Sequence, residues 1–246
     1  MMARHRPLVR VALALACAGL LMGQSGNRNR ARGMDPDNPS CPATPNWGPA
    51  TRMTLTPRDT PDGRVLVAEG VIDATVPDRL RAALEADERI GEVWLRSSGG
   101  DASAGNAAGR VIRSYRGMLT RIPAGATCFS ACNFMFMGGD RRMVDAGGIF
   151  MVHMFTHTND RTVISESVMD GTQATTELIV GIEQSSAMLA SEDNDFLIRM
   201  GISRRLLTEV MYRQQAVRTD GDPSTRYCLS PDEVRLYNVV PEERTG

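Results

Sequence analysis

The chain has 246 residues with 28 basic and 29 acidic side chains, so its net charge of −1 gives no electrostatic case for binding nucleic acid. Apolar residues make up 42% and charged residues 23%, which is typical of a globular protein and excludes general disorder. Every basic residue is arginine, and the absence of lysine excludes any mechanism in which a lysine acts as the base.

The first 22 residues have the pattern of an export signal. Three arginines precede an apolar run, residues 11–22, which is short for a membrane span and suits the core of a secretory signal. Cys17 lies in a sequence that loosely resembles a bacterial lipobox, and cleavage after Ala18 is an alternative. Either form predicts an exported protein, periplasmic or held through its N-terminus at a membrane facing the periplasm. An uncleaved anchor or a wrongly assigned start codon is the other interpretation.

Four further cysteines would meet an oxidising compartment after export. Two disulfides in three possible pairings are then open to Cys41, Cys128, Cys132 and Cys228, and the sequence does not choose among them. The Cys-x2-Cys pairs and clustered histidines of a zinc site are missing. We therefore expect no metal and no cofactor.

The remaining chain divides into a linker and one domain. Residues 23–61 lack a hydrophobic period, which predicts a low-order linker or arm, and residues 62–241 form the predicted domain. Strands alternating with helices and short glycine loops predict an α/β domain with both sheet faces covered. The expected elements are a strand in 63–72, a helix over 74–87, a strand from 90 into a glycine turn ending at 100, a helix over 102–117, a strand over 118–125, a helix opened by the serine segment 125–139, two short strands in 141–155, and a helical segment over 172–213 broken near Gly201.

Two glycine-rich turns each follow a predicted strand and open a helix. The first, SSGGDASAG at 97–105, lacks the spacing of a dinucleotide site, but its backbone N–H groups suit a developing oxyanion. A tight turn without chemistry is the alternative. The second, GATCFSACNFMFMGG at 125–139, places Ser130 near a helix start, where a serine is often only an N-cap. His153 follows 23 residues later at the end of an apolar strand, and the two together indicate a nucleophile with its base.

These segments together resemble the proteolytic subunit of the Clp protease and its relatives in the ClpP/crotonase superfamily. The order and spacing of RVLVAEGVID, EVWLRSSGGDASAG, CFSACNFMFMGGDRRMV and GGIFMVHMF match over roughly residues 64–155, and RYCLSPDEVRLYNVV is similar to the closing motif of that family. The resemblance implies a spiral of β-β-α units and allows a homo-oligomer.

The resemblance also implies roles for individual residues. Ser130 would be the nucleophile, His153 the general base, and the backbone N–H groups of Gly100 and Ala131 the oxyanion hole. The third member of the triad would be Asp222, with Asp220 as the next choice. A Ser–His dyad or an inactive site is left open.

The chain also departs from the family pattern in two places. Ser98 stands where the family has a proline in the glycine turn. Cys128 and Cys132 flank the serine, and Cys128 as an alternative nucleophile has no counterpart in the motif. We expect these cysteines to pack the turn around the serine.

The predicted function is that of an exported serine peptidase that cleaves peptides or unfolded protein through an acyl-enzyme. The Ser–Lys mechanism of related peptidases is excluded by the missing lysine. A catalytically inactive binding or scaffold protein is the main alternative. A crotonase-type acyl-CoA enzyme is the third, and the export signal and the Ser-Ala pair count against it.

Overall fold

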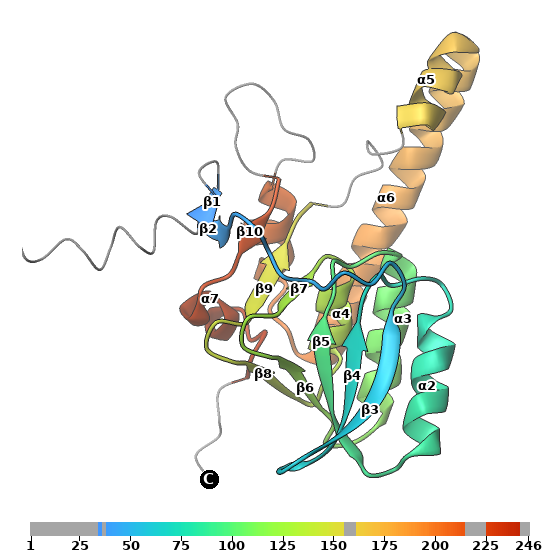
Figure 1. Ribbon diagram of the computed structural model, residues 1–246. Helices are drawn as coiled ribbons and strands as arrows, with labels where there is room; N and C mark the ends of the chain where they lie inside the picture. The colour runs from blue at the N-terminus through green and yellow to red at the C-terminus, as the bar shows by residue number, and fades with distance from the viewer. Residues whose placement is uncertain (1–33, 36–37, 155–160, 215–224, 242–246) are drawn as a thin grey trace, which may run out of the picture.

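The computed structural model describes residues 34–35, 38–154, 161–214 and 225–241. Its main sheet has the strand order β3-β4-β5-β6-β8, in which β3 is antiparallel to β4 and the other neighbours are parallel (Figure 1). The strands are β3 Thr54–Thr60, β4 Gly63–Glu69, β5 Ile90–Arg96, β6 Leu119–Ile122 and β8 Arg141–Val144. Helices between successive parallel strands confirm the α/β class predicted from the sequence.

A smaller sheet carries the serine and histidine segments. It contains β7 Thr127–Phe129 and β9 Ile149–Val152, which are parallel, and β10 Tyr227–Cys228, which is antiparallel to β9. Ser97, directly after β5, donates its N–H to Thr127 and accepts the N–H of Phe129, both at 3.0 Å. The two sheets therefore meet where β5 ends and β7 runs toward Ser130.

Three helices pack on the sheets and fix the spacing around the serine segment. They are α2 Val76–Ala86, α3 Ala102–Ser114 and α4 Cys132–Met137, and α3 contacts both of the others. Asp101 caps α3 by accepting the N–H of Ala104. A Cβ at Gly105 would lie 2.5 Å from the carbonyl oxygen of Ala131, so a glycine there lets α3 approach the serine turn closely.

In the described chain, two helices and several shorter helical segments follow β9. α5 Arg161–Met169 and α6 Thr172–Met200 extend together away from the sheets (Figure 1). α6 ends at Gly201, whose φ of 69° is left-handed, as the sequence predicts for a break there. Short helical turns over Leu206–Val210 and Met211–Arg213 follow, and α7 Pro231–Leu236 begins with a Ser230–Glu233 capping box. In the described part of the chain, no helix has the length and apolar character needed to cross a membrane.

The segment before β4 is ordered where the sequence predicts a low-order arm over residues 23–61. The structure corrects that expectation for the described part, which contains β1 Met34–Asp35, β2 Asn38–Pro42 and β3. β3 pairs with β4 over all seven residues, and Met53 before it is buried in the core. Pro57 is accepted in β3 because this strand lies at the edge of the sheet.

Candidate active site

Ser130 lies in a sharp turn between β7 and α4. Its φ of 59° is left-handed, a conformation that non-glycine residues adopt rarely and at a cost of about 1–2 kcal/mol. The carbonyl oxygen of Ser130 accepts the N–H of Asn133 at 2.9 Å and so connects the turn to α4. Strained conformations of this kind occur at functional sites, where the surrounding structure holds them in place.

His153 meets Ser130 directly. The Ser130 Oγ and His153 Nε2 atoms are 2.6 Å apart, and both residues are half-buried. The parallel pairing of β7 with β9 brings the two residues close, because Phe129 pairs with Met151, and Ser130 and His153 follow those two residues by one and two positions. The Phe129 ring packs on the imidazole with centroids 4.7 Å apart.

The environment of His153 favours the neutral imidazole. Burial lowers the pKa of His153, and the backbone of Met154 partly opposes this through a hydrogen bond. In the neutral tautomer that carries its proton on Nδ1, Nε2 accepts a hydrogen bond from the Ser130 hydroxyl, which is the arrangement that a general base requires.

The glycine turn lies against the same serine. A Cβ at Gly99 would lie 2.6 Å from the Ser130 Cβ and 2.7 Å from the Phe129 carbonyl oxygen, so only glycine fits there. Within the described residues, neither the Gly100 N–H nor the Ala131 N–H donates a hydrogen bond. These two predicted oxyanion donors therefore have no protein acceptor within the described residues. Gly100 directly follows Gly99 and Ala131 directly follows Ser130, so both donors adjoin the contact between Gly99 and Ser130.

Ser97 holds the glycine turn, a role that the sequence analysis did not assign. Its hydroxyl donates to the Gly70 carbonyl oxygen at 2.6 Å and accepts the N–H of Gly99 at 3.0 Å. Ser97 is fully buried, so these two bonds are the way its hydroxyl is satisfied. Its position as the first serine of SSGG, directly before the glycine turn, is the sequence feature that could have predicted this role.

The third member of the predicted triad lies outside the described residues, since neither Asp222 nor Asp220 is among them. In the parts that the structure describes, no carboxylate forms a hydrogen bond or an ion pair with His153. The ring is oriented there by Phe129 and by the backbone of Met154. The same described parts contain no group of three or more His, Cys, Asp or Glu residues that could hold a metal ion.

A buried carboxyl shares the cleft with the serine and the histidine. Asp193 of α6 is only 5% exposed, and its Oδ1 atom has no hydrogen-bond partner within the described chain. Burial raises the pKa of Asp193 to about 7, and the neighbouring Asn106 partly opposes the rise. An acidic residue in a helix gives no sequence signal of burial. The described lining of the cleft is Ala102, Ser130, Ala131, Phe134, His153, Leu189, Asp193, Met211 and Tyr212.

All four described cysteines form disulfides, which decides among the pairings that the sequence leaves open. Cys128 bonds to Cys132 across the serine turn, and Cys41 of β2 bonds to Cys228 of β10. Cys128 therefore has no free thiol to act as a nucleophile.

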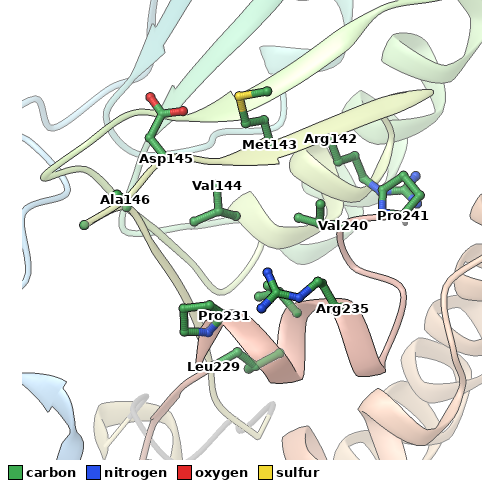
Figure 2. A pocket seen from close by; sticks show the side chains of 13 residues that line it. Arg142, Met143, Val144, Asp145, Ala146, Leu229, Pro231, Arg235, Val240 and Pro241 are labelled. Carbon is green, nitrogen blue, oxygen red and sulfur yellow. The ribbon is translucent and has the colours of Figure 1, made fainter. Parts of the chain in front are cut away.

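A larger hollow of about 400 Å³ lies between β8 and α7 (Figure 2). Figure 2 shows that its wall is mostly apolar, with Arg142, Asp145 and Arg235 among the labelled side chains. Its described lining has no residue in common with the cleft and contains no serine, cysteine or histidine. The smaller cleft is therefore the candidate active site.

Comparison with known proteins finds matches in structure but none in sequence. No protein-family model and no curated protein matches the sequence. Among solved structures, the chain is similar to a point mutant of ClpP1 from Listeria monocytogenes, with a TM-score of 0.46 and 14% sequence identity. The match covers 71% of this chain and 86% of that one. A likeness at this level does not assign a function.

Proposed function

We propose that the chain is a serine peptidase that cleaves peptides or unfolded protein through an acyl-enzyme on Ser130. The observation that carries this proposal is the 2.6 Å separation between the Ser130 Oγ and the His153 Nε2. A serine hydroxyl at its ordinary pKa is a weak nucleophile, and a neutral imidazole in hydrogen-bond contact is what activates it.

The reaction proceeds in two halves. Ser130 Oγ attacks the substrate carbonyl carbon while His153 Nε2 takes the hydroxyl proton, and the same nitrogen then protonates the leaving amine as the C–N bond breaks. Water attacks the resulting ester, gives its proton to Nε2, and releases the new carboxyl group when Ser130 regains that proton. Each half returns the imidazole to its starting state.

The backbone N–H groups of Gly100 and Ala131 are the proposed oxyanion donors. Both lack a protein acceptor within the described chain, and both adjoin the contact between Gly99 and Ser130. A preorganised donor of this kind contributes on the order of 10²–10³ in rate. Asp222 remains the proposed third member of the triad, and without it the site would act as a Ser–His dyad.

Export to the periplasm is part of the same proposal. The two disulfides support it, since such bonds persist mainly in oxidising compartments. The N-terminal 22 residues would act as the signal, with Cys17 as a possible lipid anchor. An ATP-driven unfoldase would not be available outside the cytoplasm to unfold substrate proteins. We therefore propose short peptides or already unfolded chains as the substrates. Assembly into a homo-oligomer is also part of the proposal.

Labelling with a fluorophosphonate tests this function. We expect the purified chain to be labelled on Ser130, with labelling abolished by Ser130→Ala and reduced by at least about 10³-fold by His153→Ala. The control is Ser185→Ala, which removes an exposed serine of α6 and should leave labelling unchanged.

The other candidate functions give different results. Turnover of acyl-CoA esters without labelling would favour the crotonase-type enzyme. Absence of both activities in a folded chain would favour the scaffold protein and contradict the peptidase.

A further inference from the structure

The Cys128–Cys132 disulfide encloses the candidate nucleophile. Cys128 lies in β7 and Cys132 is the first residue of α4, so the bond joins the residues two before and two after Ser130. Both cysteines are fully buried, and their Cα atoms are 5.3 Å apart. Among the described residues that line the cleft, Ser130 is the one with a left-handed φ, which a serine adopts at an energetic cost.

Besides the disulfide, Gly99 and Gly105 pack closely against the turn at Ser130, and few backbone hydrogen bonds hold it. The left-handed φ of Ser130 is opposed by its own side chain. On its N-terminal side the Phe129 N–H donates to the Ser97 carbonyl oxygen at 3.0 Å. On its C-terminal side the N–H groups of Asn133 and Phe134 donate to the carbonyl oxygens of Ser130 and Ala131 at 2.9 and 3.2 Å. α4 has only six residues, so it provides little helical cooperativity to hold its own first turn.

The two disulfides of this chain have different effects on the fold. A cross-link restricts the unfolded chain more as its loop lengthens, and the separations are 187 residues for Cys41–Cys228 and 4 for Cys128–Cys132. The short loop therefore adds little to overall stability compared with the long one. Its main effect is local, on the backbone between the two cysteines.

We propose that Cys128 and Cys132 are positioning residues of the active site: their disulfide holds Ser130 in the conformation that brings its Oγ to His153. The same bond restrains the Ala131 N–H, which lies inside the ring and is one of the two proposed oxyanion donors. The inference rests on the proposed function. It predicts that the oxidised chain is the active form and that the chain with this bond open retains its fold and loses reactivity.

The test measures the rate constant and the final extent of fluorophosphonate labelling separately. The extent reports how many sites are folded, and the rate constant reports how reactive each site is. We expect C128A/C132A to label with a rate constant roughly 10- to 100-fold lower per site, since a displacement of about 1 Å at a reacting group has that effect. The matched control, C41A/C228A, should keep the wild-type rate constant per site.

A second measurement applies if C128A/C132A does not fold. The wild-type chain is treated with dithiothreitol, which becomes a cyclic disulfide as each opened protein disulfide takes up two electrons and two protons. Mass spectrometry identifies which bond has opened at each time, and the rate constant should fall with the opening of Cys128–Cys132.

Three outcomes overturn the inference. An unchanged rate constant with Cys128–Cys132 open shows that the bond does not position Ser130. A reduced extent at an unchanged rate constant shows that the bond only stabilises the fold. No labelling of oxidised wild type overturns the proposed function, and the inference with it.

Discussion

Replacing Asp193 by asparagine tests whether the buried carboxyl in the cleft has a raised pKa. The replacement should make the protein more stable at pH 8 but not near pH 4. The carboxyl is 5% exposed, and burial raises its pKa from 3.8 to about 7. The native chain therefore binds more protons than the unfolded chain between these values. Stability falls as the pH rises through this range.

The size of the effect follows from the shift in pKa. One pH unit corresponds to 1.36 kcal/mol, so a pKa raised from 3.8 to about 7 costs the wild type up to about 4 kcal/mol above pH 7. The amide that replaces the carboxyl in the variant carries no charge at any pH. We expect the change in the free energy of unfolding caused by Asp193→Asn to be about 2–4 kcal/mol more favourable to the folded state at pH 8 than at pH 4.

Urea unfolding followed by circular dichroism between pH 4 and pH 8 measures this difference. Asp195→Asn is the control, since Asp195 is half-exposed and Arg199 lowers its pKa, so its replacement should give a small effect of opposite sign. Parallel stability curves for wild type and Asp193→Asn would refute the reasoning, because they would mean that the carboxyl titrates normally in the folded chain.

Three further predictions concern the residues around the cleft. Since burial lowers the pKa of His153, the acid limb of the pH profile for labelling should have a midpoint below 6.5. Gly99→Ala should lower the labelling rate constant by more than about 10-fold, since its Cβ would clash with Ser130 and displace a reacting group. Removing both Cys41 and Cys228 should lower the free energy of unfolding by about 3–5 kcal/mol, because that disulfide closes a long loop.

The controls for these predictions come from the same chain. Gly125→Ala introduces a side chain at a φ of 74° with no atom within 4 Å, so it shares the backbone strain of Gly99→Ala without the clash and should label normally. A midpoint above 6.5 would contradict the account of His153. Removal of Cys128 and Cys132 should cost only about 2 kcal/mol, and an equal cost for both disulfides would contradict the loop argument.

The elements between β4 and β9 were largely predictable, because apolar periods and glycine turns mark them directly. The three-residue strand β7 was missed, since so short a segment shows no period and exists only by pairing with β9 and Ser97. β3 has no strand signal in the sequence, since its residues show no hydrophobic period and include Pro57, and the structure shows that its side chains are mostly exposed. Its order comes from hydrogen bonds to β4, which the sequence of β3 alone does not show.

The serine and the histidine of the candidate site were predictable from the sequence, whereas the backbone conformation of the serine and the other groups in the cleft were not. Ser130 and His153 were identified from their spacing and resemblance, and the structure places them in hydrogen-bond contact. The left-handed φ of Ser130 was not predictable, because a non-glycine residue rarely adopts it and no sequence pattern marks it. The burial of Asp193 was not predictable either, because it depends on neighbours far away in the chain. Asp222 and Asp220, which the resemblance suggests as the third member of the triad, both lie outside the described residues.

The Cys41–Cys228 bond also changes what a cleaved molecule looks like. Because it joins β2 near the start of the described chain to β10 near its end, one peptide-bond cut anywhere between them leaves two fragments still covalently attached. A nicked protein would keep its full mass on a non-reducing gel and separate into fragments only after reduction.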